Sequence, residues 1–183
     1  VDAEIDKFDY VLVALPAPQA VELLSDAPDM HAQAGSVEMA PCWAGMYVFP
    51  EPLPFGFDGA FLSEKPLSWV ARDSSKPGRP PVEAWVLHAG PGWTHENLAM
   101  EGDEAAKAIL EEFRALIGPT PDPIFQRAHR WAFALASDPV PHGALFDEDL
   151  KIGACGDWCM GGRIEGALLS GIAAARRILQ NLK

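Results

Sequence analysis

The first apolar run of the chain predicts a buried strand followed by a helix. Residues 10–15 are all apolar or aromatic, a pattern typical of a strand that is buried on both faces within a parallel sheet. Pro16 ends the run, and Pro18 suits the first turn of a helix with Val21 and Leu24 on its apolar face. The chain therefore begins with α/β character.

The middle of the chain has the pattern of an antiparallel sheet with one helix. Between about residues 36 and 87, short runs rich in Val, Trp, Tyr and Phe alternate with Pro and Gly clusters. Apolar residues at three- and four-residue spacing then predict a helix over 103–117, with Asp103 as its N-cap and Gly118 just past its end. We expect one more strand over residues 127–136.

The last part of the chain returns to α/β character. Residues 150–154 predict a short strand, and residues 164–182 predict a helix after a glycine-rich turn. The apolar face of this helix consists of Ile164, Leu168, Ile172, Ala175, Leu179 and Leu182. A second stripe of small residues would let a ligand or a sheet approach the helix closely, and it contains Gly166, Ser170 and Ala173 or Ala174.

These segments together predict an α+β fold. A chain that leaves one domain, builds a second and then returns is the simplest account of α/β ends around an antiparallel middle. We place the boundaries at 1–30, 31–136 and 137–183, with a mixed, mainly antiparallel sheet and one packing helix in the central part. The strand at 10–15 should then lie beside the strand that ends at residue 154.

Composition and charge exclude several classes of function. The chain has 183 residues, 49% of them hydrophobic, and a formal net charge of −12. A surface this acidic repels nucleic acid and anionic membranes. The sequence contains neither an apolar run of the ~18 residues that a membrane span needs nor a signal-peptide pattern, so we expect a cytoplasmic protein. Three cysteines without zinc spacing indicate packed thiols, and we expect no metal site.

The stretch from Ile152 to Ala175 carries the most specific chemistry. It runs from a strand through Gly156-Asp157 and Gly161-Gly162 into a helix. Glycines let the backbone approach a ligand closely, and the amides that open a helix attract electron-rich atoms. Asp157 can accept hydrogen bonds from the hydroxyls of a sugar-like chain. Without a ligand, the same pattern would be a glycine-capped surface helix.

Gly156-Asp157 together with residues 165–171 (Glu-Gly-Ala-Leu-Leu-Ser-Gly) resembles the C-terminal flavin motif of the flavin amine oxidase superfamily. In that family the acidic residue contacts the ribityl-phosphate part of FAD, and the first amides of the helix face the pyrimidine edge of the flavin ring. The resemblance implies that FAD is the cofactor. The matching cofactor-binding positions are Gly156, Asp157, Gly162, Arg163, Ile164, Glu165 and Gly166.

Four further segments, residues 9–18, 69–79, 83–88 and 129–131, resemble the renalase-type branch of this superfamily. Members of that branch combine a Rossmann-type FAD domain with a substrate domain, and they oxidise dihydro isomers of NAD(P)H with oxygen as acceptor. The resemblance implies such an enzyme, with the central domain binding a dihydronicotinamide dinucleotide and the two ends belonging to the FAD domain. True amine oxidation is the alternative within the superfamily.

The chain departs from this family in one respect. The family begins with a strand, a Gly-x-Gly-x-x-Gly turn and a helix that bind the FAD pyrophosphate, and these residues contain no such turn. We therefore expect a piece of a longer protein that needs an N-terminal FAD-binding segment as its partner. The chain alone should be inactive and bind FAD weakly or not at all. A natural split protein, or a cofactor-free binding domain derived from such an enzyme, are the other possibilities.

Four residues are candidates for substrate binding. His129 and Trp131 should share one face of a strand and Arg130 the other, so this strand could stack on or anchor a dinucleotide. The alternative is a core tryptophan with a salt-bridged arginine. Arg72 lies in a local basic cluster that could attract a substrate phosphate, or that could simply be a solvated loop. His88 and Trp85 should lie on opposite faces, and His88 alone is more often structural than catalytic.

Overall fold

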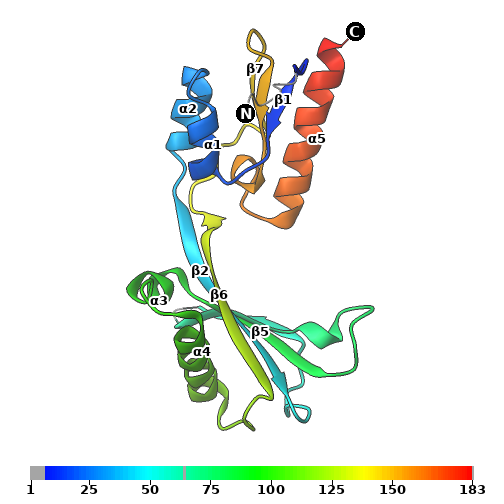
Figure 1. The fold of residues 1–183 in the computed structure, drawn as a ribbon. Helices are drawn as coiled ribbons and strands as arrows, with labels where there is room; N and C mark the ends of the chain where they lie inside the picture. The colour runs from blue at the N-terminus through cyan, green and yellow to red at the C-terminus, as the bar shows by residue number, and fades with distance from the viewer. Residues whose placement is uncertain (1–6, 64, 183) are drawn as a thin grey trace, which may run out of the picture. The chain divides into compact units, whose positions relative to one another are not determined.

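The structure is a computed structural model that describes residues 7–63 and 65–182. It divides into two compact units (Figure 1). The first unit contains the chain up to Ala40 and from Phe133 onward, and the second contains Pro41–Ala132. Each is described separately below. No helix in the described part of the chain is long and apolar enough to cross a membrane.

The first unit contains a three-stranded sheet in the order β1-β8-β7. Strand β1 (Val11–Val13) runs parallel to β8 (Ile152–Ala154), and β7 (Leu145–Asp147) runs antiparallel to β8. The parallel pairing confirms that the first strand lies beside the strand ending at Ala154. The expected burial of β1 on both faces is wrong, because the edge position leaves Val11 48% and Leu12 38% exposed.

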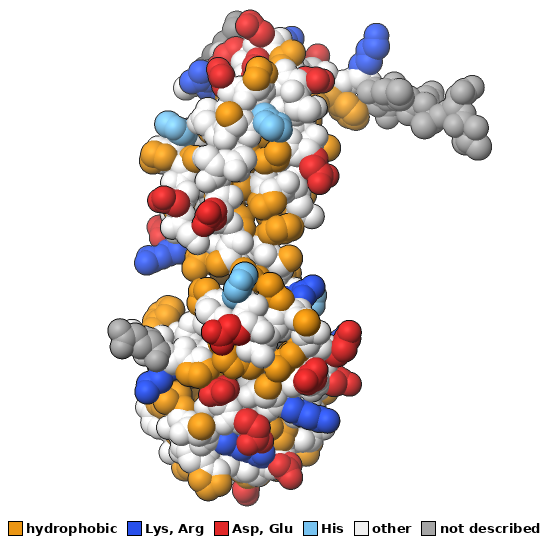
Figure 2. Space-filling view, turned by 90° about the vertical axis from the view of Figure 1, so that its left-hand side faces the viewer, with side chains coloured by type: hydrophobic (Ala, Val, Ile, Leu, Met, Phe, Trp, Pro, Cys, Tyr) orange, Lys and Arg blue, Asp and Glu red, His pale blue; other side chains and the backbone are white. Residues whose placement is uncertain are grey.

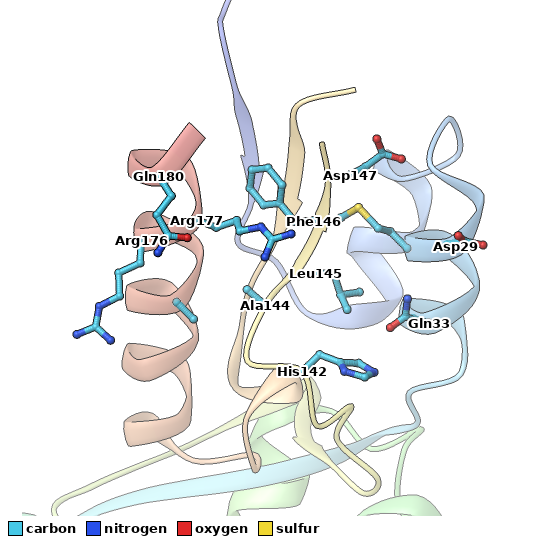
Figure 3. Close-up of a pocket in the computed structure, with 12 residues that line it drawn as sticks. Asp29, Gln33, His142, Ala144, Leu145, Phe146, Asp147, Arg176, Arg177 and Gln180 are labelled. Atoms are coloured by element: carbon cyan, nitrogen blue, oxygen red, sulfur yellow. The ribbon is translucent and has the colours of Figure 1, made fainter. Parts of the chain in front are cut away.

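Three α-helices flank this sheet. Helices α1 (Ala17–Leu23) and α2 (Pro28–Gly35) lie on one side of the strands and α5 (Ile164–Asn181) on the other (Figures 1 and 3). The predicted α1 is confirmed, with Pro18 in its first turn. Helix α2 was not predicted. Pro28 opens it, and Asp29 lies in its first turn, where a carboxylate is favourable.

The prediction of α5 is confirmed, but the face assigned to the protein interior is wrong. Ile164 is 92% exposed and Leu168 64% exposed, and Ile172, Leu179 and Leu182 are exposed as well. The small residues Gly166, Ser170 and Ala174 face the interior instead. Small side chains let the helix backbone approach its neighbours closely, whereas the larger ones would hold it away.

The second unit is built on a five-stranded sheet in the order β3-β4-β5-β2-β6. Its strands are β2 (Met39–Phe49), β3 (Gly59–Phe61), β4 (Leu67–Arg72), β5 (Glu83–Ala89) and β6 (Phe125–Ala136). The pairs β3–β4, β4–β5 and β2–β5 are antiparallel, which confirms the predicted antiparallel sheet. The outer residues of β2 and β6 belong to the first unit.

One face of the second-unit sheet is covered by α4 (Gly102–Ile117). The core there joins Tyr47, Trp85 and Leu87 of the sheet to Ile109 and Phe113 of the helix. The predicted helix is confirmed, but its N-cap is Glu101, so Asp103 is not the cap. Gly102 already has helical conformation, which moves Asp103 into the first turn, where its charge favours the helix dipole.

Two short helices in the second unit lie outside the predicted pattern. Helix α3 (Pro91–Glu96) begins at a proline directly after β5, and the 3-10 helix η1 (Asp73–Ser75) follows β4. Both are too short for a helical repeat to be recognised in the sequence.

In the face of the molecule shown in Figure 2, acidic side chains are spread among apolar ones.

Candidate functional site

The glycine-rich turn joins β8 to α5 through the 3-10 helix η2 (Asp157–Cys159). Gly161 and Gly162 have φ angles of +93° and +67°, values that glycine adopts without a steric cost. The amide of Gly162 donates to the Asp157 carbonyl oxygen over 2.9 Å, which closes the turn. These two glycines allow the chain to reverse between β8 and α5.

The turn is packed on the small-residue stripe of α5. The amide of Gly156 donates to the Ser170 Oγ over 3.0 Å, and Ser170 is fully buried. A Cβ atom on Gly166 would overlap the carbonyl oxygen of Met160. The stripe that we expected to meet a ligand or a sheet therefore contacts the turn itself, and Gly166 faces the protein rather than solvent.

The first turn of α5 is open. Arg163 is the N-cap residue and makes no side-chain capping hydrogen bond, and Arg163, Ile164 and Glu165 are exposed. Backbone amides in the first turn of a helix have no partner within the helix. Asp157 lies half-buried beside them, with its Oδ1 accepting from the Trp158 amide over 2.9 Å. The seven predicted cofactor-binding positions thus lie on one continuous turn and helix start.

Trp158 fixes the turn to the segment that follows β1, a role that sequence reasoning missed. Its side chain is fully buried, and its indole Nε1 donates to the Leu15 carbonyl oxygen over 2.9 Å. Gly156 leaves room for this ring, because a Cβ atom there would lie 2.5 Å from the Nε1. A tryptophan inside a glycine-rich turn was the available signal in the sequence.

The thiols near the turn are buried and protonated. Cys155 and Cys159 are both buried free cysteines, and burial raises the pKa of Cys159 to about 12. A thiol with such a pKa is almost entirely uncharged at neutral pH and is a poor nucleophile. The two cysteines therefore act as packing residues in this structure.

In the second unit, β6 presents two of the predicted substrate residues together. The rings of His129 and Trp131 meet edge to face, with centroids 4.5 Å apart, and Trp131 is 57% exposed. Ala128, the residue before His129, belongs to the core cluster under α4. Alternation along the strand therefore places His129 and Trp131 on the sheet face away from α4.

Arg130 points to the other side of β6, as the alternation predicted. Its guanidinium lies 5.9 Å from the centre of the Trp43 ring, and its Nη1 donates to the Leu98 carbonyl oxygen. These groups line a cavity of about 520 Å³ beside Trp43, together with residues 98–102. Arg130 thus lies on the opposite face of β6 from Trp131, whereas His129 also lines this cavity.

Arg72 is not brought together with the β6 residues. It lies on β4, and two strands separate β4 from β6 in the sheet. Its Nε and Nη2 donate to the Glu83 Oε2 over 3.0 and 2.7 Å. Glu83 is buried and also accepts from the Trp85 Nε1 over 2.8 Å. The arginine therefore neutralises a buried carboxylate, a role that its position in a basic cluster did not indicate.

The cross-strand register reveals a second aromatic pair that sequence reasoning missed. Trp69 on β4 stands opposite His88 on β5, with ring centroids 4.9 Å apart and both side chains half-buried. His88 and Trp85 do lie on opposite faces, as predicted, because Trp85 belongs to the core under α4. Burial, and to a smaller extent the charge of Lys76, lowers the pKa of His88, so its ring is neutral at pH 7.

A larger cavity in the first unit contains none of the predicted site residues. It has a volume of about 840 Å³ and lies between α2, β7 and α5 (Figure 3). Arg177 extends toward its centre in Figure 3, and its Nε bonds the Glu148 Oε1 over 2.5 Å. Asp29, Asp147 and His142 also line it. The large volume of this cavity is not by itself a reason to assign it the same ligand as the glycine-rich turn.

Residues 1–179 match the family described as flavin containing amine oxidoreductase. The chain belongs to this family, whose members are flavin-dependent oxidoreductases. The match covers the glycine-rich turn and both units. It is a match to the family as a whole, so the renalase-type branch stays a prediction.

Solved structures with the same fold include cyclohexylamine oxidase from Brevibacterium oxydans IH-35A, with a TM-score of 0.69 and 16% identity over 94% of this chain and 43% of that one. A protein from Exiguobacterium sp. 255-15 that carries the name protoporphyrinogen oxidase has a TM-score of 0.68 and 20% identity, covering 95% of this chain and 41% of that one. Putrescine oxidase bound to putrescine has a TM-score of 0.61 and 12% identity, covering 93% and 42%. The chain spans less than half the length of these structures.

Proposed function

We propose that this chain is part of an FAD-dependent oxidoreductase of renalase type, which oxidises dihydronicotinamide donors (isomers of NAD(P)H) and passes the electrons to oxygen. The observation that carries the proposal is the open start of α5 beside Asp157, reached through two glycines of positive φ. FAD, when bound, supplies a ring that accepts a hydride from the donor.

The residues of the turn fit the ribityl and ring end of FAD. The first-turn amides of α5, at the exposed residues Ile164 and Glu165, could donate to an electron-rich ring edge, and the helix dipole favours negative charge there. The carboxylate of Asp157 has an oxygen beyond the one that holds the Trp158 amide, and it can accept from a hydroxyl of the ribityl chain. The protein would thus orient the ring and stabilise charge on it.

The sheet of the second unit would hold the donor. His129 and Trp131 offer ring surfaces on the face away from α4, and such rings could stack on or anchor another planar part of the nicotinamide dinucleotide. Arg130 remains a proposed anchor for the dinucleotide and Arg72 a proposed contact for its phosphate, although both already have protein partners. Hydride transfer requires a positioned donor carbon rather than a side-chain nucleophile.

We further propose that a segment outside these 183 residues completes the FAD-binding site. The glycine turn after β8 would hold only one end of an extended cofactor, and the pyrophosphate would need a second helix start with its own amides. The chain alone would then be inactive, and the whole protein would work in the cytoplasm.

Amine oxidation is the second candidate, because the names of two structural neighbours are cyclohexylamine oxidase and putrescine oxidase. The discriminating experiment compares substrates on a longer protein that contains this chain. Oxygen consumption should follow dihydronicotinamide isomers and not cyclohexylamine or putrescine. Turnover of the amines with no turnover of the dihydronicotinamides would overturn the proposal in favour of the second candidate.

A further inference from the structure

The register of the second-unit sheet defines its open face. Positions paired with core residues, such as Leu87 opposite Gly45, point toward α4, so the intervening positions point away from it. The open face of the three central strands therefore presents Ala44, Met46, Val48, Trp69, Ala71, Ala84, Val86 and His88.

The charge on this open face differs from that of the whole chain. The sequence carries 26 Asp and Glu residues against 14 Lys and Arg. Among the eight central positions, His88 is the only ionisable side chain, and no carboxylate is present. An ammonium group placed there would lose its hydration without gaining an anionic partner among these positions, and only a cation–π contact with Trp69 would offset part of that cost. An uncharged ring would lose little.

Two aromatic rings lie near one end of this face. Trp69 and His88 stand on neighbouring central strands, tilted by 52° with centroids 4.9 Å apart. Ala44 pairs with His88 and Ala71 pairs with Val86, so the side chains opposite these two residues are small. Side chains on central strands are held more rigidly than those on loops, which suits the positioning of a reacting ring.

We propose that Trp69 and His88 form the surface on which the uncharged dihydronicotinamide ring of the donor stacks. This inference rests on the proposed function and extends it, because it names the residues that select a planar uncharged ring over an ammonium group. Trp69 provides the stacking surface, and His88 holds the indole and adds a second ring edge.

The test uses the 183-residue chain with reduced nicotinamide mononucleotide as the probe. Proton NMR should show upfield ring-current shifts of the probe's ring protons. Trp69→Leu should abolish these shifts and weaken binding by roughly tenfold, since stacking of a base on an aromatic side chain is typically worth about 1–3 kcal/mol and 1.4 kcal/mol is tenfold. His88→Gln should weaken binding less, and His88→Phe should restore it by keeping a ring there.

Two control variants separate this role from a structural one. Trp93→Leu and His95→Gln, both on α3, should bind the probe like the original chain, because Trp93 packs against the core on the α4 side of the sheet and His95 is exposed. Circular dichroism establishes that each variant is folded. Unchanged shifts in folded Trp69→Leu, or no binding of the probe to the original chain, would overturn the inference while leaving the proposed reaction to the turnover assay. Benzylamine bound at Trp69 in place of the probe would overturn both.

Discussion

At the scale of single residues, Asp157 combines two roles. Its carboxylate holds the Trp158 amide, and its carbonyl oxygen accepts from the amides of Met160 and Gly162 over 2.9 Å each. These bonds shape the turn from within. In the proposed function the second carboxylate oxygen bonds the cofactor, so removing the side chain should affect cofactor retention more than folding.

Replacing Asp157 with alanine, in a longer protein that contains the chain, should weaken FAD retention by about one to two orders of magnitude. A hydrogen bond to a charged group is worth roughly 1.5–3 kcal/mol, and each 1.4 kcal/mol is tenfold in affinity. The flavin-to-protein ratio after dilution measures the effect. Asp149→Ala, at an exposed aspartate before β8, is the matched control and should keep its flavin. Full flavin content in folded Asp157→Ala would remove this residue from the site.

His88 should make stability depend on pH. Its folded-state pKa lies below the ordinary value of 6.5, because burial disfavours the charged ring. The unfolded chain then takes up a proton before the folded chain does, so this residue's contribution is present above about pH 6.5 and is lost as the pH falls. The urea midpoint should drop between pH 7.5 and 5.5, and less so in His88→Gln. An equal drop in His88→Gln and in the exposed-site control His95→Gln would contradict this account.

At the scale of elements, the length of the hydrophobic pattern decided which helices and strands the sequence could predict. Helices α4 and α5 have 16 and 18 residues, long enough for apolar spacing to be recognised. Strand β7 has three residues and α3 has six, too few for a periodic signal, and both were missed. The interior face of α5 was assigned wrongly because its large apolar residues were weighed above Gly166 and Ser170.

Two glycines of α5 give a matched test of its packing. Gly166→Ala should destabilise the protein, because the added methyl would overlap the Met160 carbonyl oxygen. Gly171→Ala has open space around it and should stabilise the helix by about 1 kcal/mol, the difference between glycine and alanine in a helix. Thermal or urea unfolding of both variants measures the sign of the change in the free energy of unfolding. Stabilisation by Gly166→Ala would mean that α5 does not pack on the turn in this way.

At the scale of the whole molecule, the sequence predicted which residues of the glycine-rich turn lie together better than it predicted which residues of the second-unit sheet do. The residues of the turn are close in the chain, so one motif contains all of them, from Gly156 to Gly166. The pairing of Trp69 with His88 depends on the register between two strands, which a single sequence does not specify. The salt bridge between Arg72 and Glu83 could not be predicted for the same reason.

Exposed apolar surface in the first unit agrees with the proposal that more polypeptide belongs to it. The outer face of α5 carries large exposed side chains, and within the described part of the chain β1 has a neighbouring strand on one side only. Related structures are more than twice as long, since this chain covers 41% and 43% of two of them. The proposed FAD site would accordingly be shared between this chain and a glycine-rich segment outside it.

This central claim is tested most directly by the flavin content of the purified chain. It is compared with the flavin content of a longer protein that includes a Gly-x-Gly-x-x-Gly unit. Several charge-assisted hydrogen bonds to the pyrophosphate, worth roughly 1.5–3 kcal/mol each, are assigned to the outside segment. We predict about one flavin for each longer chain, essentially none on the 183 residues alone, and no micromolar binding when FAD is titrated into them. Stoichiometric flavin on the 183-residue chain, or a longer protein that purifies without flavin, would contradict the account.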